Sequence, residues 1–230
     1  MKRNIGFYWQ NLKKITYYDF IDELEFALNG CESVLDLACG SSSPIQHLPK
    51  KFHAVGCDTF AAAIEQSQKD GIHDQYLFLN VLDLDKKFPP KSFDGVLALD
   101  LIEHLEKEEG FRLIVLMEKI AKKKMIILTP NGFLPQQEYG ENVWQIHKSG
   151  WSVEEMRKKG FRVIGLLGWK ALRGNKGSLK FSPKTFWSII STLTQWVVKK
   201  KPEWAFQILC VKDLTQKGDS LDNGNPPNPP

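Results

Sequence analysis

One short segment constrains the fold of this chain more than any other. Residues 33–44 read SVLDLACGSSSP, an apolar strand that runs into an acidic residue, a loop of small residues and a helix start. Asp58 follows 18 positions after Gly40, at the end of a second apolar segment. A small-residue loop after one strand and an acid after the next are how an open α/β sheet holds a nucleoside. The segment therefore predicts a ligand at the carboxyl ends of neighbouring parallel strands.

Apolar and amphipathic segments alternate along the rest of the chain. The expected strands cover residues 33–37, 54–57, 76–79, 95–99, 125–128, 161–167 and 204–211. The expected helices cover residues 18–28, 61–69, 104–120, 152–159 and 184–198. Ser43 followed by Pro44 is typical of a helix cap with a proline in the first turn. This alternation predicts an α/β fold, in which helices cover both faces of a parallel sheet.

Composition divides the chain into three parts. Residues 1–30 are expected to form a helical lead-in or lid, and residues 31–212 the main domain, with a helical insertion at 168–202 before the last strand. Residues 213–230, which become rich in Asn and Pro, cannot bury apolar surface and are expected to be disordered. The irregular residues 131–150 are long enough to be functional or mobile.

Charge and cysteine usage exclude several classes of function. The net charge of +4 comes from lysines and arginines that are spread rather than striped, so no nucleic-acid partner is expected. The four cysteines have no CxxC spacing, which predicts free thiols in a reducing compartment and no metal site. No apolar run reaches the roughly 20 residues that cross a bilayer. We therefore expect a cytoplasmic protein.

Four segments stand in an order that is typical of one enzyme family. They are VLDLACG at 34–40, AVGCD at 54–58, SFDGVLALDLIEHL at 92–105 and LTPNG at 128–132. Together they resemble the class I S-adenosylmethionine-dependent methyltransferases, over about residues 30–212. The resemblance implies a three-layer α/β sandwich, whose mostly parallel seven-stranded sheet has the order 3-2-1-4-5-7-6 with strand 7 antiparallel. It also implies methyl transfer from S-adenosylmethionine, with S-adenosylhomocysteine as the product.

The resemblance places the cofactor against the polar ends of the strands. Asp58 can accept hydrogen bonds from two ribose hydroxyls, unless it merely caps the next helix. Asp36 can favour the cationic end of the cofactor by electrostatics and through a bridging water, or it can be a solvated acid. Gly40 lets the backbone approach the ligand. The residues expected to bind the cofactor are Asp36, Ala38, Gly40, Asp58, Thr59, Asn80, Val81, Asp83, Asp100 and Leu101.

The remaining positions of this set have narrower roles. Asn80 is the preferred partner for the adenine amino group and Asp83 the next choice, while Val81 covers the face of the ring. Asp100 and Leu101, at the end of the fourth strand, are expected near the transferred methyl group. These roles follow from the resemblance and from the place of each residue at a strand end.

Two positions depart from the family pattern. Ala38 and Ser42 stand where these methyltransferases usually have glycine. A Cβ there narrows the allowed loop conformations, although the hydroxyls of residues 41–43 can donate to the cofactor instead. The departures leave a second interpretation open, a catalytically inactive Rossmann-like protein that binds the cofactor or a partner.

Candidate bases and the acceptor are less sharply defined. A general base is needed only if the acceptor arrives protonated. His147 is the first candidate and His104 the second, and a structural role remains open for both. Asp100 and the next three residues lack the Asn/Asp-Pro-Pro-aromatic pattern of enzymes that methylate nucleic-acid bases. The acceptor is therefore expected to be a small molecule, with apolar, lipid and sugar-containing compounds included.

The helical insertion has several interpretations. Its helix is rich in apolar residues and is followed by Lys199, Lys200 and Lys201. It can be a cover packed on the sheet or a dimer contact, and it can also be a wall for an apolar acceptor. Contact of residues 184–201 with an anionic membrane surface is a further alternative. The sequence does not predict an oligomeric state.

Overall fold

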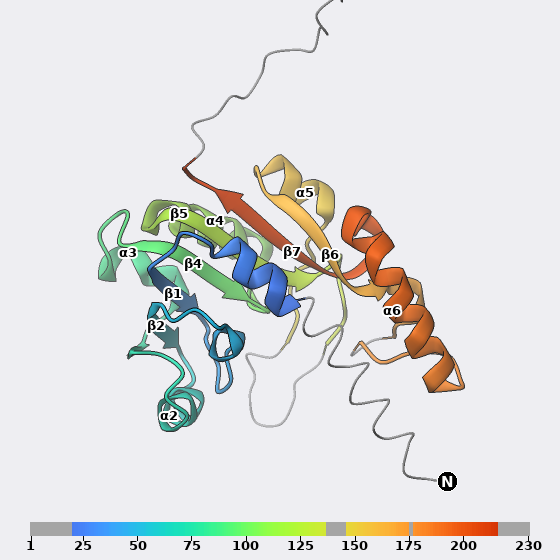
Figure 1. The fold of residues 1–230 in the computed structure, drawn as a ribbon. Helices are drawn as coiled ribbons and strands as arrows, with labels where there is room; N and C mark the ends of the chain where they lie inside the picture. The colour runs from blue at the N-terminus through green and yellow to red at the C-terminus, as the bar shows by residue number, and fades with distance from the viewer. Residues whose placement is uncertain (1–19, 137–145, 175–176, 216–230) are drawn as a thin grey trace, which may run out of the picture.

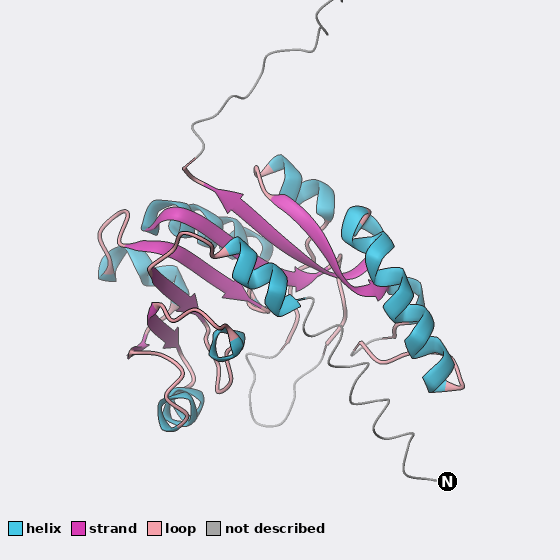
Figure 2. Ribbon diagram, in the orientation of Figure 1, coloured by secondary structure: helices cyan, strands magenta, loops and turns pink. Residues whose placement is uncertain are grey.

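The computed structural model describes residues 20–136, 146–174 and 177–215. These residues form a seven-stranded sheet flanked by helices (Figures 1 and 2). The strands are β1 (Ser33–Leu37), β2 (His53–Asp58), β3 (Gln75–Phe78), β4 (Phe93–Leu99), β5 (Ala121–Pro130), β6 (Arg162–Trp169) and β7 (Ala205–Asp213). Their order in the sheet is β3-β2-β1-β4-β5-β7-β6, which confirms the expected topology.

Helices and short 3₁₀ turns connect the strands. The α-helices are α2 (Ala61–Lys69), α3 (Leu84–Lys87), α4 (Lys107–Ile120), α5 (Val153–Lys158) and α6 (Lys184–Lys200), and a further helix covers residues 20–27. The 3₁₀ turns are Pro44–His47, Val81–Asp83, Ile102–His104, Lys170–Leu172 and Pro202–Trp204.

The parallel register brings the carboxyl ends of three strands to one edge of the sheet. Leu37 of β1 pairs with Cys57 of β2 on one side and with Ala98 of β4 on the other. The chain leaves β2 at Asp58 and passes Asp100 just beyond β4. Acidic side chains that are far apart in the sequence therefore share the edge at which open α/β sheets bind ligands.

The last two strands close the sheet in the reversed order that the sequence predicts. Leu209 of β7 pairs antiparallel with Leu128 of β5 and with Ile164 of β6. α6 comes into backbone contact with β6, because a Cβ built on Gly165 would lie 2.1 Å from the carbonyl oxygen of Val198. The insertion helix is therefore packed against the edge strand of the sheet.

Successive residues of the central strands face two hydrophobic cores. Leu35 packs in one core with Leu113 and Met117 of α4. Val34 packs in the other with Leu24 of the helix over residues 20–27. Figure 1 shows this N-terminal helix in front of the sheet and α4 behind it. Because both faces are covered, the central strands are mostly apolar rather than regularly alternating with polar residues.

The helix that precedes β5 begins at Lys107, three residues later than predicted. Residues 102–104 form a 3₁₀ turn, and Leu105 is extended. The side chain of Glu106 accepts a hydrogen bond from the backbone N–H of Glu109, the third residue of the helix. The side chain of Glu109 in turn accepts one from the backbone N–H of Glu106. This capping box fixes the start of α4.

Two other elements differ in extent from the prediction. The Ser43 hydroxyl caps the following turn through the N–H of Ile45, as expected, but the turn is only a four-residue 3₁₀ helix. β5 begins at Ala121, four residues earlier than predicted. Its first half contains residues 122–124, which are all lysines, so apolarity alone did not mark it as strand.

The described part of the N-terminal region is packed on the sheet. Leu24 and Leu28 are completely buried in the same core as Val34. The expected tail covers residues 213–230, but its first residue, Asp213, is the last residue of β7. The rest of the tail from residue 216 onward lies outside the described residues. The division into lead-in, domain and tail remains a prediction. Within the described ranges, none of the helices combines the length and the apolarity needed to cross a bilayer.

Candidate functional site

A cavity of about 440 Å³ opens at the carboxyl ends of β1, β2 and β4. Its volume lies within the range of small-molecule sites, about 300–1,000 Å³. The predicted site residues on its wall are Ala38, Gly40, Asp58, Thr59, Asn80, Val81, Asp100, Leu101 and His104. The wall is completed by Ser41, Phe60, Ala62, Ala63 and Leu105. The cavity therefore brings together residues from the loops after four different strands.

The Asp58 carboxylate joins two of these loops. Its Oδ2 accepts the backbone N–H of Gly40 and its Oδ1 accepts the backbone N–H of Phe60, both at 2.9 Å. Each carboxylate oxygen has a second lone pair. Asp58 is therefore held in a fixed orientation on the cavity wall while it can still accept hydrogen bonds from a ligand.

The loop after β1 has a left-handed backbone at two positions. Ala38 has a φ of +50° and Gly40 a φ of +60°. The N–H of Cys39 between them donates to the carbonyl oxygen of Cys57 in β2 at 3.0 Å. A Cβ built on Gly40 would meet no protein atom within 4 Å, so the space beside this residue is open. At Ala38 the same conformation is strained, by about 1–2 kcal/mol.

Asp36 lies behind this loop rather than on the cavity wall. The residue is 1% exposed, and its Oδ2 accepts the Ser43 hydroxyl at 2.5 Å and contacts His73 Nε2 at 2.9 Å. Its predicted influence on a cationic ligand therefore acts through space. His73 was not predicted from the sequence, because it stands 37 residues after Asp36 in a connecting loop.

The segment after β3 offers one polar and one apolar group. Asn80 Oδ1 accepts the N–H of Leu82 at 2.9 Å and caps the following 3₁₀ turn, and Val81 is a buried part of the wall. Asp83 is not among the lining residues. Its carboxylate pairs with Lys86 at 2.7 Å on the surface. The geometry thus brings Asn80 and Val81 to the cavity but leaves Asp83 away from it.

Two acidic residues follow β4. Asp100 has a φ of +51° and accepts the side-chain amide of Gln207. Desolvation by the surrounding protein raises the pKa of Asp100 to about 6, although the residue is partly exposed to solvent. Glu103 is 2% exposed, and its Oε2 accepts the Thr129 hydroxyl at 3.0 Å. Burial, and then the nearby Asp100 charge, raise the pKa of Glu103 well above its usual value.

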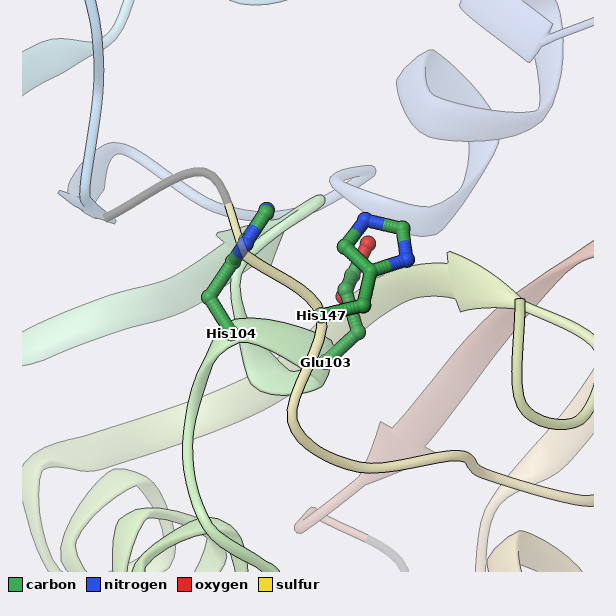
Figure 3. A group of neighbouring side chains, drawn as sticks. All are labelled: Glu103, His104 and His147. Carbon is green, nitrogen blue, oxygen red and sulfur yellow. The ribbon is translucent and has the colours of Figure 1, made fainter. Parts of the chain in front are cut away.

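The two candidate bases lie next to each other. The rings of His104 and His147 meet edge to face, with their centroids 4.8 Å apart, and the Glu103 side chain lies beside them (Figure 3). Burial lowers the pKa of both histidines. His104 lines the cavity, whereas His147 is not part of its wall. The sequence predicted the two histidines as alternatives and did not predict that they form a group with Glu103.

Backbone contacts hold the segment of His147 against the turn of Glu103. The N–H groups of Lys148 and Ser149 donate to the carbonyl oxygen of Glu103 at 2.8 and 3.1 Å. The indole of Trp151 donates to the Ser149 hydroxyl at 3.0 Å and is completely buried. The irregular residues 146–151 are therefore anchored to the end of β4.

Comparison with protein families decides the identity of the fold. Residues 35–134 match the family described as "Methyltransferase domain". These residues form a methyltransferase domain, and the chain has the fold of the class I S-adenosylmethionine-dependent methyltransferases. The matched residues run from β1 past the end of β5 and include the cavity wall. No curated protein sequence matches this chain.

Solved structures share the fold of this methyltransferase domain at low sequence identity. A SAM-dependent methyltransferase from Archaeoglobus fulgidus has a TM-score of 0.52 and 17% identity, over 84% of this chain and 94% of that one. The plantazolicin methyltransferase BamL, solved with S-adenosylhomocysteine and a substrate analogue, has a TM-score of 0.50 and 17% identity, over 91% and 90%. The [4+2]-cyclase SpnF has a TM-score of 0.51 and 13% identity, over 84% and 78%.

The cofactor of the methyltransferase domain is S-adenosylmethionine. When bound, it supplies a methyl group on a positively charged sulphur. The residues of the cavity fit this molecule: Asp58 has free lone pairs for hydroxyl groups, and Val81 and Leu101 offer apolar surface. The open space beside Gly40 fits a ligand that lies directly against the backbone.

Proposed function

We propose that the protein transfers a methyl group from S-adenosylmethionine to a small-molecule acceptor. The orientation of Asp58 is the observation that carries the proposal. Two backbone N–H groups hold its carboxylate on the cavity wall and leave lone pairs for the ribose hydroxyls. An aspartate that only capped helix α2 would not need a hydrogen bond from the loop after β1. Asp58 accepts such a bond from the backbone N–H of Gly40.

The other residues have supporting roles in this proposal. The part of the cavity around Asp58 is lined by Ala38, Gly40 and Thr59. The adenine would bind against Asn80 and Val81. Asp83, which points into a surface ion pair, is the weaker adenine candidate. Asp100 and Leu101 lie at the end of β4 and border the site of methyl transfer, while Asp36 favours the cationic end from behind the loop.

The protein's own contribution to the reaction is to orient the acceptor and exclude water. Correct orientation of two reacting groups can lower a barrier by about 7–11 kcal/mol. Where the acceptor is protonated, His104 is the candidate base that lines the cavity. His147, which is not part of the wall, packs edge to face on the ring of His104.

A small acceptor is favoured over a nucleic acid by the segment after β4. Asp100 and the three following residues lack the proline-containing pattern of enzymes that methylate bases. Lysines and arginines are also spread along the chain rather than gathered in a stripe. The four cysteines are free and buried, which supports a reducing, cytoplasmic compartment.

We also propose that α6 contacts an anionic membrane surface. Its apolar residues Phe186, Ile189, Leu193 and Trp196 recur every three or four positions and are between 49% and 69% exposed. The Lys200 ammonium lies 4.5 Å from the centre of the Trp196 ring. An apolar helix face bordered by aromatic and basic residues is typical of helices that lie in a membrane interface.

Lys201, directly after α6, also lies close to an exposed aromatic ring. Its ammonium lies 5.0 Å from the ring centre of Trp204, which is 49% exposed. Positive charge beside the apolar face complements anionic headgroups. Such a surface also fits an apolar or lipid acceptor, since the enzyme would meet it at the membrane.

A second candidate function is a cofactor-binding protein without catalytic activity. The strained Ala38, at a φ of +50°, is the observation that favours it, because the family usually has glycine there. The similarity to a cyclase shows that this fold is not restricted to proteins named as methyltransferases.

Product formation separates the two candidates. Purified full-length protein is incubated with methyl-labelled S-adenosylmethionine and a panel of phenols, sugars and lipid extracts, and labelled product and S-adenosylhomocysteine are measured together. The proposal predicts that both appear in equal amounts with at least one acceptor. Tight binding of the cofactor without turnover across the whole panel would favour the inactive binding protein.

A further inference from the structure

Glu103, His104 and His147 converge from two segments of the chain. Glu103 and His104 belong to the 3₁₀ turn after β4, and His147 to the segment before α5. One donor atom from each residue lies within 4.8 Å of the other two. Figure 3 shows both imidazole rings and the carboxylate gathered around one small region. A carboxylate with two imidazoles is a set of groups that proteins use to hold metal ions.

In each of the two histidines, a hydrogen bond to a backbone carbonyl fixes the proton on Nδ1. His104 Nδ1 lies 3.1 Å from the carbonyl oxygen of Ile146, and His147 Nδ1 lies 2.7 Å from that of Leu134. A carbonyl oxygen only accepts, so each Nδ1 carries the hydrogen and each Nε2 keeps a lone pair. Histidines that bind metals are oriented by such bonds to backbone carbonyls.

Glu103 contributes a buried carboxyl group to the cluster. It is 2% exposed, and its Oε2 accepts the Thr129 hydroxyl. Among the described residues, no lysine, arginine or histidine forms an ion pair with Glu103. Ionisation of a buried carboxyl group is costly without a cation, and a metal ion bound beside it would offset that cost.

We propose that Glu103, His104 and His147 bind a divalent transition-metal ion at the β4 end of the cavity. Two imidazole ligands favour Mn²⁺, Fe²⁺, Co²⁺ or Zn²⁺ over Mg²⁺ and Ca²⁺, which take oxygen ligands. Two metal–nitrogen bonds of about 2.1 Å span at most about 4.2 Å. One possible ligand atom of each residue lies within 4.8 Å of the other two, which is close to this spacing.

The proposed ion gives the acceptor a chemical class, and this step rests on the proposed function. Three protein ligands leave coordination positions open, and His104 lies on the cavity wall. A hydroxyl group of the acceptor can fill an open position, where the metal lowers its pKa. The hydroxyl proton then passes to water, the oxygen forms a bond to the methyl carbon, and the electron pair of the carbon–sulphur bond stays on sulphur. The acceptor is therefore a phenol or an alcohol.

The sequence alone did not indicate this site. His104 and His147 are 43 positions apart, a spacing that belongs to no metal-binding pattern. Each was interpreted as a separate base. The loop contacts between Glu103 and residues 148–149 bring the two histidines together only in the folded chain.

Titration of the metal-free, full-length protein with Co²⁺ tests the proposal. We expect one Co²⁺ per chain, followed by its visible absorption bands. We also expect two shifted, exchangeable Nδ1–H proton signals in the NMR spectrum, one from each bound histidine. Weak binding at many sites, or a spectrum without these two signals, would overturn the proposal without any variant being needed.

Matched variants separate this site from the cofactor site. Glu103→Gln and His147→Gln should each weaken Co²⁺ binding at least about 100-fold. Both should keep their affinity for S-adenosylhomocysteine, because neither residue lines the cavity. His53→Gln is the control, since His53 is an exposed histidine paired with Asp74 elsewhere. Co²⁺ affinity that survives in both variants, or falls equally in the control, would contradict the site.

The reverse experiment tests independence from the proposed function. Asp58→Asn should weaken binding of S-adenosylhomocysteine and leave Co²⁺ binding unchanged, because Asp58 has no contact with the histidine group. Loss of Co²⁺ binding in Asp58→Asn would show that the metal is not held by the three proposed ligands. Retained Co²⁺ binding in a protein that does not bind the cofactor would refute the proposed function but not the metal site.

Discussion

His73 Nε2 and Asp36 Oδ2 lie 2.9 Å apart, in a pair whose side chains are 0% and 2% exposed. The pair ties the loop before β3 to the end of β1, directly behind the cavity. Gly56 makes this approach feasible, since a Cβ there would stand 3.0 Å from the His73 ring. The contact explains why Asp36 is turned away from the cavity wall.

Removal of His73 should therefore destabilise the protein strongly. His73→Ala leaves a buried carboxylate without its partner, a change that costs about 3–5 kcal/mol. Denaturant unfolding measures the loss. His53→Ala is the matched control, because His53 faces Asp74 at 3.7 Å with both side chains more than half exposed. We expect less than about 1 kcal/mol for the control. Equal effects of the two variants would show that the buried pair contributes nothing special.

Ala38→Gly should stabilise the protein. The left-handed conformation at a φ of +50° costs an alanine about 1–2 kcal/mol, and glycine loses about 0.5–1 kcal/mol of this gain through its greater freedom in the unfolded chain. The expected net gain in unfolding free energy is about 0.5–1 kcal/mol. Ala63→Gly, in helix α2, should instead lose up to about 1 kcal/mol. A loss of stability in Ala38→Gly would contradict the strain.

Gly110→Ala should loosen the end of the site that carries His147. A Cβ on Gly110 would lie 2.4 Å from a ring carbon of the buried Trp151, which anchors that segment. Overpacking of this kind costs about 1–3 kcal/mol. Gly174→Ala is the control, since its Cβ would make an ordinary contact at 3.7 Å. Thermal and denaturant unfolding should separate the two variants, and an unchanged midpoint in Gly110→Ala would rule out the packing described.

Trp196→Ser should weaken binding to anionic vesicles. The side chain is 69% exposed on α6, and burial of a large apolar side chain is worth about 1.5–3 kcal/mol. We expect at least a tenfold fall in partitioning to phosphatidylserine-containing vesicles, measured by sedimentation. Val115→Ser, which removes a 66% exposed apolar side chain from α4, should have no effect. Equal partitioning of the wild type to purely zwitterionic vesicles would argue against an electrostatic contribution.

Local sequence patterns predicted the parts of the fold that depend on short-range chemistry. β1 and α2 have the predicted bounds. An apolar run indicates a buried strand and an amphipathic pattern indicates a helix, and neither depends on contacts with distant residues. The start of α4 was predicted too early, since the capping box of Glu106 and Glu109 was not recognised. β5 was predicted too short because its lysines conceal the first half of the strand.

Contacts between distant segments could not be predicted in this way. Asp58 and Asp100 share one edge of the sheet because of the strand order, which the family resemblance supplied. The bond from His73 to Asp36 has no signal in residue spacing. The same holds for the meeting of His104 with His147, since each depends on how loops close over the sheet.

Calorimetric titration with S-adenosylhomocysteine tests the central claim most directly. Asp58→Ala and Asp58→Asn are compared with Asp70→Ala, which removes an exposed aspartate from the other end of α2. Loss of the paired ribose bonds to a charged group should cost on the order of 2–4 kcal/mol, or about 30- to 700-fold in affinity, with a smaller loss for asparagine. The control should bind like the wild type. An affinity of Asp58→Ala within about twofold of the wild type would contradict the placement of the cofactor in this cavity.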